Sequence, residues 1–216
     1  MRFTEHEMVF FNSITKGNEV FGIPLKFRPE GNHEEEVKRT VKGLMEKGVL
    51  KSETELSRQG VLPARALECY KESKVHIIIN YLHIALLEKK EAIVIIPLKN
   101  REYEMLRLPR VALVHLLLDK YPVLRTGAKT VDIKTEMMDM DTFLQELKEY
   151  EGNIMIGEFQ NGVVERELVY YWKEEKMYQY DLNREIRKGV NAVQVRRELL
   201  KLLRITEEVE NYGYSC

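Results

Sequence analysis

The side chains best suited to chemistry in this chain are its histidines, which could ligate a metal ion. There are five of them, His6, His33, His76, His83 and His115. No two stand four residues apart on an expected helix, and no cysteine stands at zinc-ligand spacing from them. Because coordination needs ligands that converge on one point, we predict that the chain has no metal site and no cofactor.

Two carboxylates could instead form an acid–base pair. Glu165 and Glu167 alternate along an expected strand, so they share one face and could flank a substrate. The solvated outer face of a sheet accounts for them more simply. No serine or cysteine occurs in the setting of a nucleophile elbow. The sequence therefore predicts a protein that is not an enzyme.

A third pattern resembles the end of a phosphate-binding loop. Residues 125–130 read RTGAKT, but an alanine precedes the lysine and the earlier glycine of such loops is missing. We interpret this segment as part of a linker over residues 120–138.

The aromatic residues near the C-terminus form the pattern most relevant to binding. Tyr170 and Trp172 share one face of an expected strand, and Tyr178 and Tyr180 share one face of the next, so all four could meet as a cross-strand cluster. Such a cluster is either core beneath a helix over residues 190–204 or an exposed protein-binding face. We predict that a helical partner docks here. The predicted contact residues are Tyr170, Trp172, Met177, Tyr178, Tyr180, Val193, Arg196, Arg197 and Leu200.

The order of elements that positions these residues runs twice along the chain. Residues 74–107 predict three strands followed by a helix at 109–119, and residues 153–182 predict three strands followed by the helix at about 190–204. The Asn161-Gly162 pair is a strong hairpin signal. We therefore predict an α+β fold with two quasi-symmetric halves, 1–125 and 126–216, in one compact pseudo-two-fold domain. Each half is a three-stranded antiparallel meander with flanking helices.

Capping signals predict the remaining helices. Thr4 with Glu7 indicates a helix over about 4–16, Asn32 could cap a helix over 33–48, and Asp139 or Asp141 could cap one that ends at Tyr150. Ser52 with Glu55 predicts a helical stretch to about residue 70, broken near Gly60 and Pro63. The helix at 109–119 is apolar almost all round, which predicts that it is buried.

Composition indicates an ordinary globular protein. The chain has 216 residues, a net charge of −1 and 44% hydrophobic residues, without an apolar run long enough to span a bilayer. Residues 1–125 carry 21 basic and 17 acidic side chains, giving +4, and residues 126–216 carry 13 and 18, giving −5. With only two cysteines and no signal-peptide pattern, we expect a cytoplasmic protein without a structural disulfide.

One segment provides an alternative function. Residues 37–72, followed by strands, resemble a winged helix-turn-helix in the order of their elements, with Lys51, Arg58 and Arg65 as candidate DNA contacts. Against this interpretation, Gly60 and Pro63 interrupt the recognition stretch and glutamates match its basic residues. A winged-helix-type DNA-binding regulator is therefore the alternative.

The N-terminal half resembles the EspG-type chaperones of type VII secretion systems over about residues 3–122. The resemblance is carried by FTEHEMVFF, FGIP, LMEKGVL, ELSRQGVLPARALECYKE, VHIII and LRLPRVALVHLLLDKYP. The chain is short for that family and is more similar to the small accessory proteins encoded with type VII systems in Gram-positive bacteria.

This resemblance implies an EspG-like fold, with a central antiparallel sheet and helical bundles related by a quasi-two-fold axis. It also implies a cytosolic chaperone or adaptor that binds helical secreted proteins, keeps them soluble and delivers them for export. The ATPase of the secretion machinery is a further candidate partner. No nucleic-acid partner and no stable membrane insertion are implied.

Overall fold

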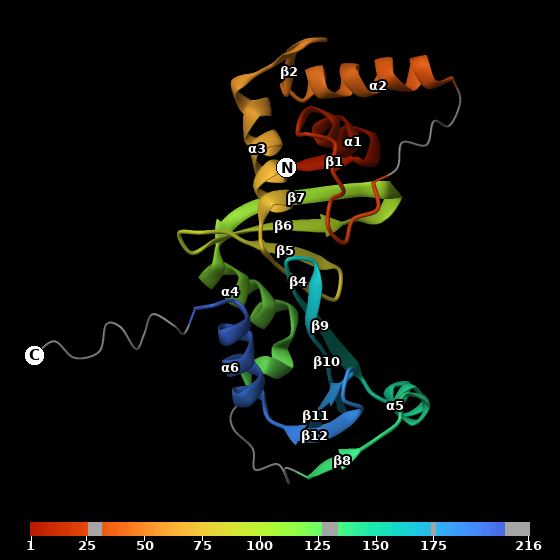
Figure 1. Cartoon of the computed structure of the whole chain (residues 1–216), viewed down its shortest axis with the longest axis vertical. Helices are drawn as coiled ribbons and strands as arrows, with labels where there is room; N and C mark the ends of the chain where they lie inside the picture. Colours follow the sequence, from red (N-terminus) through yellow and green to blue (C-terminus); the bar gives the residue numbers. More distant parts are fainter. Residues whose placement is uncertain (26–31, 127–133, 174–175, 206–216) are drawn as a thin grey trace, which may run out of the picture. The chain divides into compact units, whose positions relative to one another are not determined.

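The computed structural model describes residues 1–25, 32–126, 134–173 and 176–205, and the chain divides into two compact units (Figure 1). The first unit contains residues 1–76 and 81–107, and the second contains residues 77–80 and the chain from 108 onward. The helix that follows the first set of strands thus belongs to the second unit, whereas the sequence-based division at residue 125 placed it in the first half.

The first two helices of the first unit begin where the sequence predicts. Strand β1 (Arg2–Thr4) leads into α1 (Glu5–Ile14), which Thr4 and Glu7 close with a reciprocal capping box. Helix α2 (His33–Glu46) begins after Asn32, whose side chain accepts from the Glu34 N–H. Three glutamates in its first turn complement the positive end of the helix dipole.

The predicted third helical stretch is wrong at its start and in its break. Residues Leu50–Ser52 (β2) and Glu55–Leu56 (β3) form a small hairpin, and Ser57 caps α3 (Arg58–Glu72). The helix continues through Gly60 and Pro63. Gly60 has a packing role, because a Cβ at this position would overlap with the Val49 carbonyl oxygen.

The first predicted meander is also wrong, because its first strand is two strands. Strands β4 (Val75–Ile79) and β5 (Leu82–Leu86) are separated at Asn80, which adopts a positive φ of 53°. Strands β6 (Glu91–Pro97) and β7 (Glu102–Pro109) follow, joined through the short helix η1 (Lys99–Arg101). In the first unit the strand order is β1-β7-β6-β5, with β1 antiparallel to β7 and β5 antiparallel to β6.

A hydrophobic core holds the helices of the first unit on its strands. Its most fully buried side chains include Phe3, Phe11, Leu44, Leu67 and Tyr70. At its edge His76 stacks on the Phe21 ring at 4.6 Å, and its Nε2 lies 2.9 Å from the Tyr70 carbonyl oxygen. Burial lowers the pKa of His76, so this histidine is a neutral structural residue.

The second unit begins with helices and builds a larger antiparallel sheet. Helix α4 (Arg110–Lys120) and the short helix η2 (Pro122–Arg125) precede β8 (Thr135–Met137) and α5 (Met140–Leu147), which Asp139 caps. Within residues 125–130, only Arg125 and Thr126 are among the described residues. The other elements are β9 (Gly152–Gln160), β10 (Val163–Lys173), β11 (Lys176–Asp181), β12 (Ile186–Val190) and α6 (Ala192–Leu202).

Strand pairing in the second unit goes beyond the predicted meander. Residues of β4 begin the order β4-β9-β10-β11-β12-β8, and the pairs from β9 to β8 are antiparallel. The Asn161-Gly162 hairpin is confirmed, since both residues have positive φ and Gln160 pairs with Val163. A three-stranded meander is wrong for this half, because β12 and β8 extend it.

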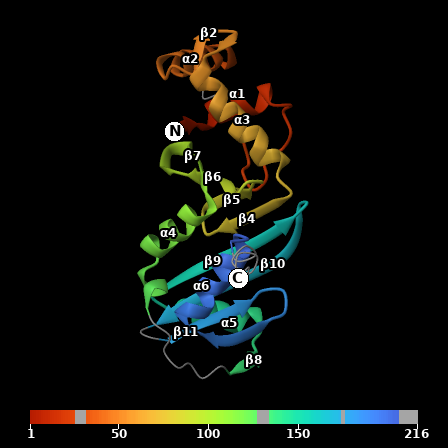
Figure 2. The ribbon, with the colours of Figure 1, turned by 90° about the vertical axis from the view of Figure 1, so that its left-hand side faces the viewer.

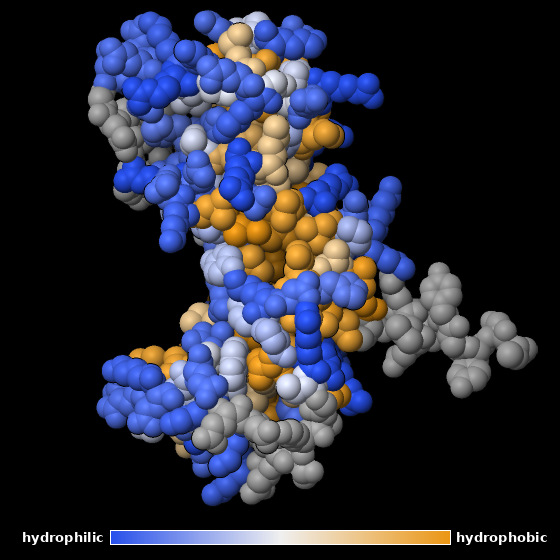
Figure 3. Space-filling model, turned by 180° about the vertical axis from the view of Figure 1, so that it is seen from behind, coloured by the Kyte–Doolittle hydropathy of each residue, from blue (hydrophilic) through white to orange (hydrophobic). Residues whose placement is uncertain are grey.

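Helices lie on both sides of the second-unit sheet. Helix α6 lies on one side of β10, β11 and β12, and α5 lies on the other (Figures 1 and 2). Helix α4 is not buried all round, contrary to the prediction: Leu113 and Leu117 are buried, but Val111 is 54% and Leu116 is 48% exposed. On the side of the molecule seen in Figure 3, hydrophobic residues are exposed next to hydrophilic ones. Within the described ranges, no helix has the length and apolar character needed to cross a membrane.

Candidate partner-binding site

The four aromatic residues predicted to meet lie on opposite faces of the sheet. Tyr170 pairs with Gln179, and Tyr171 pairs with Tyr178. Directly paired residues share a face, so Tyr178 and Tyr180 lie with Tyr171, whereas Tyr170 and Trp172 lie on the other side. The predicted cross-strand cluster is therefore wrong. Lys173 pairs with Lys176, and this register determines which side chains of the two strands share a face of the sheet.

The face beneath α5, which we call the α5 face, holds a closed aromatic cluster. The Tyr180 ring stacks on Phe143 with centroids 3.9 Å apart and an interplanar angle of 3°. The Tyr180 hydroxyl donates to the Met138 carbonyl oxygen at 2.8 Å. Tyr171 contacts Phe143 and Tyr150 edge-on. Tyr180 and Tyr171 are fully buried, so they are core residues.

An arginine completes the α5 face. The Arg187 guanidinium lies 4.0 Å from the centroid of the Tyr178 ring, a cation–π contact. It also pairs with Glu136 at 2.9 Å and with Glu146 at 3.0 Å. The Tyr150 hydroxyl donates to Glu146 at 2.7 Å. Tyr178 is thus half-buried beneath the Arg187 guanidinium.

The opposite side, which we call the α6 face, is where the strands receive the last helix. Tyr170, Met177 and Val190 are buried on it, as are Val195 and Leu199 of α6. Asn191 and Gln194 close the helix start with a reciprocal capping box, and this fixes the position at which α6 leaves β12. At the end of the sheet, half-buried Trp172 contacts Tyr121 edge-on at 6.5 Å.

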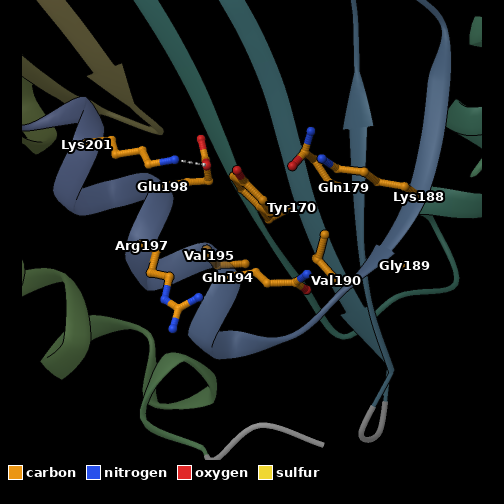
Figure 4. A pocket seen from close by; sticks show the side chains of 10 residues that line it. All are labelled: Tyr170, Gln179, Lys188, Gly189, Val190, Gln194, Val195, Arg197, Glu198 and Lys201. Carbon is orange, nitrogen blue, oxygen red and sulfur yellow. Dashed lines mark ion pairs between the residues drawn. The ribbon is translucent and has the colours of Figure 1, made fainter. Parts of the chain in front are cut away.

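A pocket of about 270 Å³ opens between α6 and strands β10, β11 and β12 (Figure 4). We call it the α6 pocket. Its lining combines apolar side chains with polar and charged ones from both the helix and the strands. The lining residues are Tyr170, Gln179, Lys188, Gly189, Val190, Gln194, Val195, Arg197, Glu198 and Lys201.

The charges around the α6 pocket are unequal. Three basic side chains, Lys188, Arg197 and Lys201, surround it with one acidic side chain, Glu198. The Glu198 carboxylate is held by Arg166 at 3.1 Å and by Lys201 at 3.5 Å. The pocket is therefore basic, although residues 126–216 carry five more acidic than basic side chains.

One buried hydroxyl lines the same pocket without a hydrogen-bond partner. Tyr170 is 1% exposed, and its hydroxyl finds no acceptor among the described residues. Figure 4 shows the hydroxyl end of the ring directed toward Glu198. Burial raises the pKa of Tyr170, with a further increase from the nearby Glu198 charge, so the hydroxyl keeps its proton and remains a donor.

The predicted helix residues differ in their exposure. Arg196 is half-buried and donates to the carbonyl oxygens of Leu124 and Thr126, so it fixes α6 to the chain after α4. Arg197 is exposed, and Val193 and Leu200 are half-buried. Of the predicted contact residues, only Tyr170 and Arg197 line the α6 pocket.

Sequence reasoning missed the polar side chains of the α6 pocket. Gln179, Lys188, Glu198 and Lys201 were not among the predicted contacts. The short Lys173–Lys176 connection could have indicated Gln179, because it pairs this residue with Tyr170. Lys188 could not be found in this way, since β12 was not predicted as a strand.

Comparisons with known proteins give a family and a fold. A family model described as "Domain of unknown function (DUF5081)" matches residues 1–211. No curated protein matches the sequence. The chain is similar to a solved structure titled "Structure of the Mycobacterium tuberculosis type VII secretion system chaperone EspG5 in complex with PE25-PPE41 dimer". The TM-score is 0.60 at 9% identity, over 95% of this chain and 96% of the other. The expected EspG-like fold is therefore confirmed at the level of architecture.

Proposed function

We propose that this chain, which belongs to the DUF5081 family, is a chaperone or adaptor that binds helical substrates of a type VII secretion system. In this role it keeps a secreted protein soluble in the cytoplasm until export. The observation that carries the proposal is the similarity of nearly the whole chain to the EspG5 structure, a chaperone solved with a PE25–PPE41 dimer. Because the similarity covers 95% of this chain, it includes residues of both compact units.

The organisation of the second unit supports a binding function. Its sheet has one face closed by aromatic packing and another that leaves a basic pocket beside an amphipathic helix. A partner helix can lie along such a helix and strand surface through a few anchoring side chains. We propose that the docking surface includes the α6 residues Val193, Arg197 and Leu200 together with the pocket. We expect no catalytic turnover by the chain itself.

Co-expression tests this proposal. The chain is produced together with the small helical proteins encoded beside its own gene, and the soluble fraction is purified through a tag on the chain. We expect one of these proteins to be soluble only when co-expressed and to elute with the chain as a complex of fixed stoichiometry. If every neighbouring helical protein is equally soluble alone and none elutes with the chain, the proposal is wrong.

Binding to the secretion ATPase is a separate expectation within the same proposal. The purified complex and the chain alone are each mixed with the soluble part of the ATPase in a sedimentation experiment. We expect the complex to co-sediment with the ATPase. Loss of co-sedimentation in both samples would limit the function to substrate binding.

A further inference from the structure

The positive charge of the α6 pocket is not compensated within the described residues. Glu198 is already engaged by Arg166 and Lys201. Lys188 and Arg197 have no acidic side chain within ion-pair distance in the described part of the chain. Figure 4 shows the Lys188 side chain extending from β12 toward Gln179, whereas the Arg197 side chain points away from the strands. Among the described residues, the strand side of the pocket therefore presents one uncompensated cationic group, Lys188.

The Tyr170 hydroxyl adds a neutral donor to these charges. A buried donor without an acceptor lowers stability, so a phenylalanine would be the more stable choice at this position. The Glu198 side chain, toward which the hydroxyl is directed, is 35% exposed and Lys201 is 65% exposed, and their ion pair is an i,i+3 contact on the helix surface (Figure 4). Such a pair is weak and is free to rearrange when a ligand enters.

The size of the pocket restricts its occupant. A volume of about 270 Å³ is just under the roughly 300–1,000 Å³ that is typical of small-molecule sites. It suits one protein side chain better than a cofactor. With the Lys188 cation and the Tyr170 hydroxyl donor on the same side of the pocket, the matching chemical group is a carboxylate.

We infer that the α6 pocket receives the carboxylate of an acidic side chain from the helical partner, an inference that rests on the proposed function. Lys188 supplies the compensating charge, and the Tyr170 hydroxyl donates to the carboxylate. The pocket then fixes the register of the partner helix, because only a helix with an acidic residue at the right position can fill it.

A titration with propionate, the side-chain analogue of glutamate, tests the pocket without a partner. Amide resonances of the full chain are followed by NMR, with propionamide as the uncharged control. We expect saturable shifts at residues 188–190 and 194–201 with propionate and none with propionamide. The Lys188→Ala/Arg197→Ala double variant is expected to bind about tenfold more weakly. Equal responses to both compounds, or no saturation, indicate an adventitious additive only and overturn the inference.

Two adjacent tyrosines provide a matched pair of variants. Both hydroxyls are buried and lack a hydrogen-bond partner among the described residues, but Tyr171 lies on the α5 face. We expect Tyr170→Phe to lower propionate affinity about threefold or more, with a melting temperature equal to or above that of the wild type. Tyr171→Phe is expected to leave the affinity unchanged. Unchanged affinity in Tyr170→Phe would show that the hydroxyl is not used, and this part of the inference would be wrong.

The source of the carboxylate is tested with the co-purified helical partner. Each of its acidic residues is changed to the corresponding amide, and we expect one change to lower recovery about tenfold in the wild-type chain. If the partner co-purifies but neither this series nor Lys188→Ala/Arg197→Ala lowers recovery, the inference fails and the proposed function stands. If propionate binds and no helical partner co-purifies, the proposed function fails and the pocket serves a free carboxylate.

Discussion

The two faces of the second-unit sheet use the same kinds of side chain in opposite ways. On the α5 face, Tyr171, Tyr178 and Tyr180 pack against Phe143 and beneath Arg187, whose charge is paired with two glutamates. On the α6 face, Tyr170 lines a pocket whose lining includes Lys188 and Arg197, and no acidic side chain of the described residues pairs with either. Tyr171 thus faces a closed aromatic core, whereas its neighbour Tyr170 faces a pocket with basic side chains around it.

Under the proposed function, this difference separates the face that stabilises the second unit from the face that binds a partner. The α5 face gains its stability from ring stacking and internal ion pairs, which leave little for a partner to contact. Both faces hold a buried tyrosine hydroxyl without a hydrogen-bond partner among the described residues, but the α6 face also has basic side chains that no described acidic side chain pairs with, and these favour a complementary ligand. The aromatic residues of this region therefore form a core on the α5 face, and we propose that Tyr170 on the α6 face takes part in recognition.

The largest expected effect is the loss of the stacked ring on the α5 face. Tyr180→Ala removes a fully buried ring and the hydrogen bond to Met138, so we expect a loss of about 3–5 kcal/mol in the free energy of unfolding. Chemical denaturation measures this loss. A Tyr180→Ala variant with wild-type stability and weakened partner recovery would instead place Tyr180 in the binding surface.

The next effect concerns the arginine over the same cluster. Arg187→Ala leaves Glu136 and Glu146 without their cation and uncovers Tyr178, with an expected loss of about 2–3 kcal/mol because the guanidinium side chain is only 16% exposed. Arg187→Lys keeps the charge but loses the planar contact with the ring, so we expect an intermediate stability. Equal denaturation midpoints for the alanine and lysine variants would contradict a role for the guanidinium plane.

On the α6 face, substitution is expected to affect binding more than folding. Arg197 is exposed, so Arg197→Ala should change the free energy of unfolding by about 0.5 kcal/mol or less. We expect the same change to weaken binding of the helical partner by about 1–2 kcal/mol, measured by calorimetry. Arg184→Ala, an exposed arginine beyond the pocket, is the matched control and should leave the affinity unchanged.

The smallest expected effect is a difference in the pH dependence of the caps of α5 and α6, the helices on the two faces. Hydrogen bonds from the Thr142 N–H and hydroxyl hold the pKa of Asp139, the cap of α5, below its usual range, whereas the cap of α6 is Asn191, which does not titrate. Because the folded-state pKa is depressed, the stabilisation by Asp139 is present above the unfolded pKa and is lost as pH falls through the folded pKa.

We therefore expect acidification from about pH 6 to pH 3 to reduce the stability of the wild type slightly more than that of Asp139→Asn. Thermal melts of both proteins across this range measure the difference. Parallel curves would show that the Asp139 cap does not contribute to the acid response.

Local sequence signals predicted much of the fold. The capping box at Thr4, the cap at Asn32 and the cap at Asp139, which was one of two candidates with Asp141, were found because each depends on side chains within three residues. The Asn161-Gly162 hairpin was found for the same reason. The start of α3 was not, because Ser52 with Glu55 has the spacing of a capping box, whereas Ser57, the actual cap, is followed at the third position by Gly60, which packs closely against Val49.

The candidate site was predicted only in part, because it depends on strand register. Tyr170 and Arg197 were named from the sequence, but the grouping of Tyr170 with Tyr178 and Tyr180 assumed that their faces match. A shift of one residue in pairing moves a whole strand's side chains to the other face. Lys188 was missed because β12 reads IRKGV, which has a glycine and two basic residues and little strand character.

Hydrogen exchange of the purified complex with its helical partner, compared with the chain alone, tests the central claim most directly. We predict that binding slows amide exchange in α6, at residues 192–202, and in β12, at residues 186–190, while α5 at residues 140–147 exchanges at the same rate in both samples. Protection confined to α5, or to the turns at 88–91 and 99–101 of the first unit, would contradict the assignment of the α6 face as the partner-binding surface.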